Sequence, residues 1–406
     1  MPRISGIHLH KPHNGARQAE FTMHLPAWMF PIAEGGLQHL VGILVSDTFP
    51  SQIYECLLSD VQVKEVDLPY GIIIDAATLY RANERTILNV RNSFNMTNQG
   101  EPLIAFSFKP RVGFDLTFAQ NVIRAVVEEG VRLVEFDTRH LSSTSHMNDW
   151  KTLATTVGDA AGRQGHTAAF APNLSHPSHL AVEQAIQWAE AADLPEPRVV
   201  KVDGGLDGLG TLQGIRRSSS RQPIVTSYPL MRRVLSQYLG SSDTWVDFFS
   251  MCAVDIIYPG NRPTFPEEYR AVGGDDARGL INSSLRYRAL VSRGRPMPSF
   301  TAGAHPGHLH SAYELLGPDV AYFLGDAIAL HPSGQRRGAR LCKEILRLAQ
   351  ENAEEAKRKE WANGKDLPAR IVTEIESYRP NGRVVRYAPP RLVFAQNPTL
   401  QPFYRL

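Results

Sequence analysis

The sequence predicts an α/β protein in which a (β/α)8 TIM barrel follows a small α+β domain, and the main evidence is a regular alternation of two patterns. Between residues 101 and 350, short apolar runs rich in β-branched residues alternate with longer amphipathic stretches. Near-continuous apolar strands separated by helices indicate a parallel sheet buried on both faces, and eight such pairs are what a β/α barrel needs. A doubly wound open sheet is the alternative, but eight regular units favour the barrel. The strands are expected at 103–109, 132–138, 167–175, 197–205, 222–229, 254–260, 297–303 and 320–328.

The segments between these strands predict helices. In residues 116–130, Phe118, Val122, Ala125 and Val126 recur at helical spacing and are expected on one buried face. Residues 176–192 show the same kind of pattern.

The two ends of the chain differ from the barrel. Residues 1–100 suggest a strand at 21–26, a helix at 37–46 and a strand at 61–69, as in a ferredoxin-like α+β domain. Residues 351–406 continue a charged helix and then form a proline-spaced tail with hydrophobic residues but little periodicity. Such a tail either packs over a surface or a neighbouring subunit, or is disordered, and the sequence favours neither alternative.

The composition excludes several classes of partner. Lys and Arg number 43 against 41 Asp and Glu, so no global charge favours nucleic acid or membrane as a partner. The three cysteines, Cys56, Cys252 and Cys342, are far apart and lack metal-ligand spacing, which is typical of reduced thiols. The N-terminal residues lack the apolar core of a signal peptide, so we expect a cytoplasmic protein.

Functional groups of such a barrel project from the carboxyl ends of its strands. The first strand ends in Lys109 and Arg111, two cations expected at the barrel mouth. In the second strand, Glu135 and Asp137 are two residues apart and therefore point the same way. These two carboxylates can bind a divalent cation, share a proton or pair with Lys109, and the sequence leaves the three options open.

The remaining strand ends supply further polar and small residues. Small residues after the seventh and eighth strands predict a phosphate site built from backbone amides, although the carboxylate of Asp326 would repel phosphate. The candidate positions at these later strand ends are Lys201, Tyr228, Arg262, Thr301, Gly303, His305 and Gly325.

Four segments together resemble a known family. They are FKPRVGF (108–114), GVRLVEFDT (130–138), TAGAHPG (301–307) and FLGDAIALHPSG (323–334). In this order and spacing they resemble motifs of the RuBisCO large-subunit family, in its RuBisCO-like (form IV) branch, and the similarity covers roughly residues 15 to 350. The resemblance implies an N-terminal α+β domain before the barrel and a homodimer, or a higher homo-oligomer, with active sites between subunits. It also implies Mg²⁺ and a sugar phosphate substrate that loses a proton to give an enediolate.

The same resemblance implies roles for the residues of the first two strands. Lys109 stands at the position of a lysine associated with proton transfer, and Arg111 is its companion cation. Glu135 replaces the lysine that becomes carbamylated, Asp137 keeps an aspartate ligand, and Thr138 replaces a glutamate ligand.

Later motif positions carry over in the same way. Tyr228 aligns with a strand-five histidine, and Arg262 lies near a mobile cationic residue. The positions that match phosphate contacts are Thr301, Gly303 and Gly325, whereas Asp326 replaces a glycine.

These replacements change the expected chemistry. Glutamate cannot form a carbamate, and the loss of a carboxylate at Thr138 should lower Mg²⁺ affinity, so Glu135 and Asp137 beside Lys109 can instead form a metal-free ion-pair cluster. We therefore expect no CO2 fixation, and an isomerase- or lyase-type enzyme acting through an enediolate is the leading hypothesis. A catalytically degenerate binding or regulatory protein is the alternative. A third hypothesis is an assembly role for the tail, residues 380–406.

Overall fold

A computed structural model of the chain shows the barrel and the helices that pack against it. It describes the backbone at 3–9, 19–24, 65–67 and 73–75. It further describes residues 86–98, 100–108, 115–136, 147–174, 187, 196–202, 223–227, 254–259, 287, 288, 290–292, 294, 296–301, 304–359, 366–378, 385–387 and 389.

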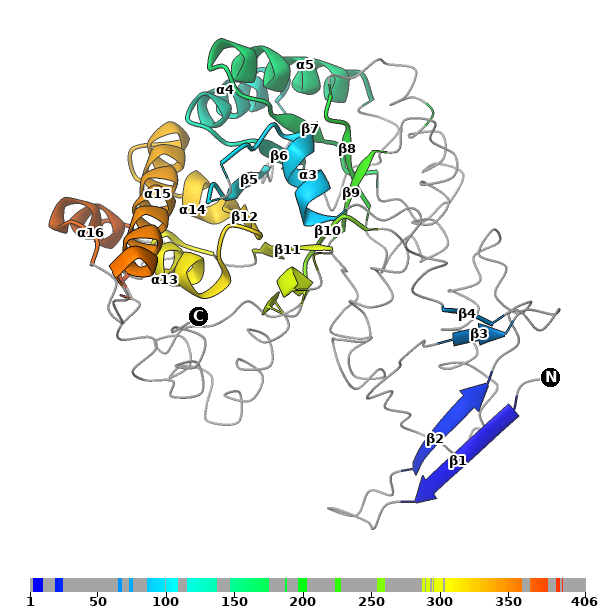
Figure 1. Ribbon diagram of the computed structural model, residues 1–406. Helices are drawn as coiled ribbons and strands as arrows, with labels where there is room; N and C mark the ends of the chain where they lie inside the picture. The colour runs from blue at the N-terminus through cyan, green and yellow to red at the C-terminus, as the bar shows by residue number, and fades with distance from the viewer. Residues whose placement is uncertain are drawn as a thin grey trace.

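Eight parallel strands form one closed sheet (Figure 1). Their order is β7-β6-β5-β12-β11-β10-β9-β8, and every neighbouring pair is parallel. The gap between β7 and β8 is closed by a parallel bridge between Asn173 and Lys201, with the Lys201 amide donating to the Pro172 carbonyl at 2.9 Å. The predicted barrel is thus confirmed, and the open sheet is wrong. The strands are β5 Leu103–Phe108, β6 Leu133–Phe136, β7 Ala169–Ala171, β8 Val199–Lys201, β9 Ile224–Ser227, β10 Ile256–Ile257, β11 Met297–Phe300 and β12 Ala321–Phe323.

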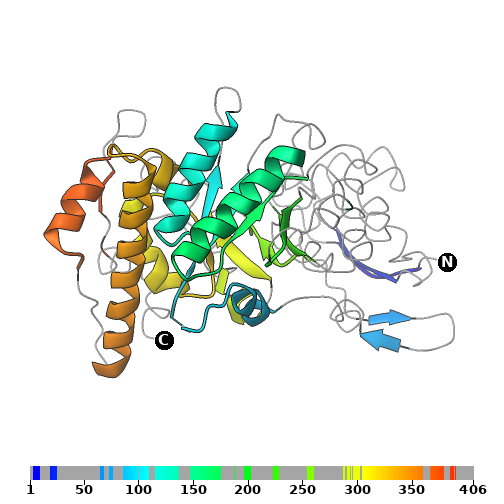
Figure 2. The same cartoon turned by 90° about the horizontal axis from the view of Figure 1, so that it is seen from above.

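Helices cover the outside of the barrel. Figure 2 shows α4 (Leu116–Glu128), α5 (Met147–Arg163) and α15 (Gln335–Lys359) side by side along its wall. The Asp115 side chain begins α4 by accepting a hydrogen bond from the Phe118 amide at 2.9 Å. The other helices are α3 Ile87–Ser93, α13 Pro306–Leu316, α14 Gly325–Ala329 and α16 Ala369–Glu376.

Two details of the predicted elements are wrong. The strand expected at 320–328 ends at Phe323, and Gly325–Ala329 is the short helix α14. Phe118 does not lie on the buried face of α4, because its side chain is 56% exposed. The buried face is instead centred one position further along, on Ala119, Val122, Ile123, Val126 and Val127. Of the helix expected at 176–192, all residues but 187 lie outside the described part of the chain.

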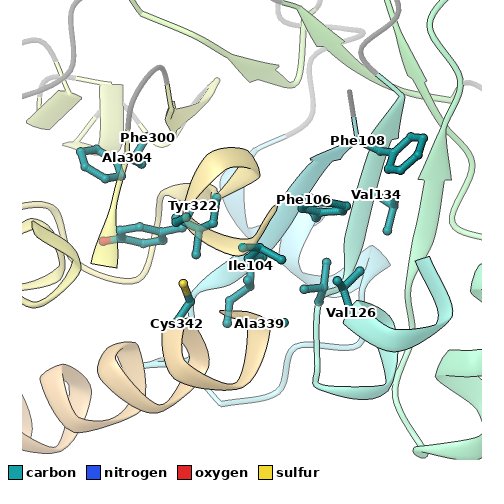
Figure 3. Packing of buried hydrophobic residues seen from close by; sticks show 14 of the residues in the cluster. Ile104, Phe106, Phe108, Val126, Val134, Phe300, Ala304, Tyr322, Ala339 and Cys342 are labelled. Carbon is teal, nitrogen blue, oxygen red and sulfur yellow. The ribbon is translucent and has the colours of Figure 1, made fainter. Parts of the chain in front are cut away.

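Alternate residues of each strand belong to two separate apolar cores. Residues that point outward, such as Phe106 and Val134, pack against the surrounding helices (Figure 3). Residues that point inward, such as Leu103 and Leu133, fill the lower part of the barrel together with Val90 of α3. This division follows from the period of two in a strand and explains why the strands read as continuous apolar runs.

Short antiparallel pairs lie in the first hundred residues. β1 (Arg3–Leu9) pairs with β2 (Ala19–His24), and β3 (Glu65–Asp67) pairs with β4 (Ile73–Asp75). β2 and β3 overlap the strands expected at 21–26 and 61–69, whereas the helix expected at 37–46 lies outside the described residues.

Part of the C-terminal tail packs on the barrel. Val385 is buried, and the Tyr387 hydroxyl lies 2.7 Å from Nδ1 of the buried His310 on α13. A Cβ at Gly307 would lie 2.1 Å from the Arg386 carbonyl oxygen, so this close approach requires glycine. Of the two alternatives for the tail, packing therefore holds for residues 385–387, while residues 391–406 lie outside the described part.

Among the helices that the structure describes, none is both long and apolar enough to span a membrane.

Candidate active site

The inner face of the barrel changes from apolar to polar toward the carboxyl ends of the strands. Ala105 and Leu133 lie in the inner apolar core, and two residues later the same strands present Ser107 and Glu135. Because alternate residues share a face, the upper inner layer can be read from each strand. Six of the eight strands contribute a polar residue to it, within the strand or just after its end: Ser107, Glu135, Asn173, Lys201, Thr226 and Ser299. In a β/α barrel this is the end where active sites are built.

Glu135 is the centre of this polar layer. The ammonium group of Lys201 forms an ion pair with its Oε1 atom. The Thr226 hydroxyl donates to Oε2 at 3.0 Å, and the Ser107 hydroxyl donates to Oε1 at 3.4 Å. These four residues, which we call the Glu135 cluster, come from β5, β6, β8 and β9 and so connect strands across the barrel interior.

The Glu135 cluster is almost closed to solvent. Glu135 is 6% exposed, Lys201 5% and Thr226 2%. Burying a carboxylate and an ammonium group costs free energy, and their attraction offsets that cost only when the geometry and the hydrogen bonds are good. A well-packed apolar pair would often stabilise a protein as much or more. A buried ion pair at the functional end of a barrel therefore indicates a role other than stability.

The Glu135 cluster does not suit the Mg²⁺ ion that the resemblance implies. Mg²⁺ requires oxygen ligands in near-octahedral geometry, and both carboxylate oxygens of Glu135 already accept hydrogen bonds from protein groups. The positive charge of Lys201 at Oε1 also repels a cation. Within the described ranges, no group of three or more His, Cys, Asp or Glu residues is arranged to hold a metal. Asp137 and Thr138 lie outside those ranges.

Lys201 and Glu135 were each predicted as site residues, but their pairing was not. Lys201 was a candidate at a later strand end, expected to bind substrate, and Lys109 was the partner considered for Glu135. Ser107 and Thr226 were missed altogether, although the alternation from Ala105 and Ile224 would have placed both hydroxyls on the inner face.

Three other predicted residues lie at the same end of the barrel. Thr301 follows β11 and is partly buried, and His305 is the N-cap of α13. The rings of His305 and His308 lie close together, with 3.6 Å between their centroids. Gly325 begins α14 directly beside β5, because a Cβ there would lie 3.1 Å from the Ser107 carbonyl oxygen. The predicted residues Lys109, Arg111, Asp137, Tyr228, Arg262 and Gly303 lie outside the described part of the chain.

The comparisons with known proteins identify the fold. No protein-family model matches the chain, and no curated protein matches it. Solved structures do match. A dimeric archaeal RuBisCO from Hyperthermus butylicus is 16% identical, with a TM-score of 0.68 over 91% of this chain and 85% of that one. A RuBisCO-like protein (MtnW) from Alicyclobacillus acidocaldarius is 19% identical, with a TM-score of 0.64 over 87% and 83% of the two chains.

A third structure is of the same kind. A RuBisCO-like protein from Burkholderia fungorum is 15% identical, with a TM-score of 0.64 over 88% of this chain and 89% of that one. At these identities the likeness establishes the fold, and the chain has the fold shared by RuBisCO and RuBisCO-like proteins.

Proposed function

We propose that this chain is a RuBisCO-like enzyme that removes a proton from a small hydroxylated, phosphorylated carbon acid and passes through an enediolate without fixing CO2. Two features support the proposal: the fold shared with RuBisCO-like proteins and the polar layer at the active end of the barrel. The way in which the enediolate then reacts decides whether the enzyme is an isomerase or a lyase.

The Glu135 cluster is the observation that carries this proposal. A protein gains little stability from a buried carboxylate–ammonium pair compared with apolar side chains of similar volume. The described inner residues below it are apolar, so on this face the charged side chains appear at the end where β/α barrels bind substrates. Such preorganised charges act strongly on a bound substrate because water is excluded.

The position of Glu135 argues against CO2 fixation. By the sequence resemblance, a lysine that reacts with CO2 to form a carbamate occupies this position in RuBisCO. The Glu135 carboxylate has no amine to react, and its oxygens are held by Lys201 and Thr226. A carboxylase with this barrel would need a carbamate on a residue other than Glu135.

The remaining roles are proposals drawn from the sequence. Lys109 directly follows β5 and is the proposed acid and base, and Arg111 and Arg262 are the proposed partners of substrate anions. Asp137 and Tyr228 are the further proposed catalytic groups. The proposed phosphate contacts are Thr301, Gly303, His305 and Gly325.

We also propose a homodimer or a higher homo-oligomer. One of the solved structures with this fold is described as dimeric. Light scattering coupled to size exclusion tests this directly, and a monomer across the micromolar range would contradict it.

The test of the function is proton exchange. In D2O, the wild-type protein should exchange the hydrogen next to the carbonyl of at least one member of a panel of ketose and aldose phosphates, as followed by proton NMR. Exchange should be lost in Glu135→Gln and retained in Lys151→Met, which changes an exposed lysine on α5. The absence of exchange across the panel would favour the degenerate binding protein, and binding of the same compounds by calorimetry would then identify its ligand.

A further inference from the structure

We propose that the Lys201 ammonium group takes the place of a divalent cation at Glu135, so that proton abstraction in this barrel needs no metal. The mechanistic half of this inference rests on the proposed function. The structural half, a cation site filled by a side chain, can be tested without any substrate.

Protein donors already hold both oxygens of the Glu135 carboxylate. Oε1 is held by Lys201 and Ser107, and Oε2 is held by Thr226. These donors come from three strands other than the one that carries Glu135, so the carboxylate is fixed from several directions. A metal ion at this carboxylate would have to displace at least one of these donors.

The charge of the Glu135–Lys201 pair also disfavours a metal ion. In the buried cluster, one carboxylate faces one ammonium group, so the pair is neutral. A divalent cation added beside Lys201 would place like charges together in a site with little water, where repulsion is strong. The Lys201 side chain already supplies the positive charge beside the Glu135 carboxylate.

Lys201 and Glu135 both lie at the carboxyl ends of their strands. Lys201 is the last residue of β8, and Glu135 is next to last in β6, so both lie in the layer closest to the strand ends. Lys201 therefore lies next to the carboxylate at the end of the barrel where a metal would serve a substrate. An ammonium group can likewise stabilise a developing oxyanion by electrostatics.

Binding of Mn²⁺ tests the structural half. Mn²⁺ shares the preference of Mg²⁺ for oxygen ligands, and its free concentration can be followed by electron paramagnetic resonance. In the wild-type protein, the Glu135 carboxylate should bind no Mn²⁺. Glu135→Gln should therefore leave Mn²⁺ binding unchanged. Lys201→Met exposes the carboxylate to cations and should gain Mn²⁺ binding at least about tenfold above the nonspecific binding of wild type, since ligand charge sets affinity. The double variant Glu135→Gln/Lys201→Met should lose this gain, and Lys151→Met should behave as wild type.

Two results would overturn the inference. One is Mn²⁺ binding by the wild-type protein that Glu135→Gln abolishes, a measurement that needs no Lys201 variant. The other is a folded Lys201→Met protein that gains no binding. If thermal unfolding shows that Lys201→Met does not fold, Lys201→Gln makes the same comparison with a neutral polar side chain.

Proton exchange in the presence of EDTA tests the mechanistic half. Exchange that continues unchanged in EDTA and is lost in Lys201→Met is the expected result. Exchange that stops in EDTA and returns with Mg²⁺ would overturn the inference and leave the proposed function standing. If no compound exchanges, the proposed function fails, and the Mn²⁺ experiment still decides whether Lys201 fills a cation site.

Discussion

Removing one partner of the buried ion pair should destabilise the fold much more than removing both. In Glu135→Leu, the Lys201 ammonium stays buried without its counter-charge, which typically costs about 3–5 kcal/mol. The Thr226 hydroxyl also loses its acceptor, which adds about 1 kcal/mol. We therefore expect a loss of about 4–6 kcal/mol in the free energy of unfolding.

The double variant Glu135→Leu/Lys201→Met should recover most of this loss. With both charges removed, Leu at position 135 and Met at position 201 extend the apolar core beneath them, and only the hydroxyl groups around them stay polar. Replacement of a buried pair by apolar residues is often neutral, or stabilising by about 1–4 kcal/mol. The double variant should therefore unfold at a urea concentration close to that of wild type, while showing no proton exchange.

Urea unfolding followed by circular dichroism measures these differences as shifts of the midpoint at constant slope. The matched control is Glu351→Leu, whose partner Arg347 lies one turn earlier on α15 and whose pair is exposed. Such surface pairs contribute about 0.3–0.5 kcal/mol. A loss of stability in Glu135→Leu no greater than in Glu351→Leu, or a double variant as unstable as Glu135→Leu alone, would contradict this prediction.

Three further predictions concern the packing around the barrel. Gly338→Ala should lower the unfolding midpoint because its Cβ would lie 2.5 Å from the Ile328 carbonyl oxygen. The control is Gly162→Ala in α5, whose Cβ meets nothing within 4 Å and which should raise stability by about 0.5–1 kcal/mol. Burial lowers the pKa of His331 below its ordinary value of 6.5, so the unfolded chain takes up the proton more readily, and stability should fall as the pH drops through about 6.5. His331→Asn should flatten that pH dependence, and a slope that is unchanged would contradict the assignment to His331. Burial also raises the pKa of the Cys342 thiol, so iodoacetamide should modify it only when the protein unfolds, and mass spectrometry at increasing urea concentrations checks this.

Much of the barrel could be predicted because its strands are buried on both faces. The continuous apolar runs identified all eight strands, and each observed strand lies within its predicted range. Their ends were less predictable. Ala327 and Ile328 are buried and apolar, but they belong to the helix α14, and an apolar run of that length fits a strand or a helix equally well.

The site could be predicted only as a set of strand ends. Glu135 and Lys201 are 66 positions apart, and nothing in their local sequences says that their side chains meet. Which inward residues touch depends on how the closed sheet is staggered and tilted, and that is a property of all eight strands together. Thr226 and Ser107 carried a signal in their alternation with apolar neighbours. Threonine and serine in a strand are common enough to pass unnoticed.

The two layers inside the barrel separate stability from chemistry. The lower layer is apolar and is closed at the amino ends of the strands by α3, with Val90 and Phe94 buried against it. This packing holds the strands, and Glu135 and Lys201 stand on two of these strands, so the strand backbone positions the ion pair. Rigid strands are the better support for a charged site that must keep its shape. Changes in the loops should therefore alter which substrate binds, whereas the charge that meets it is set by β6 and β8.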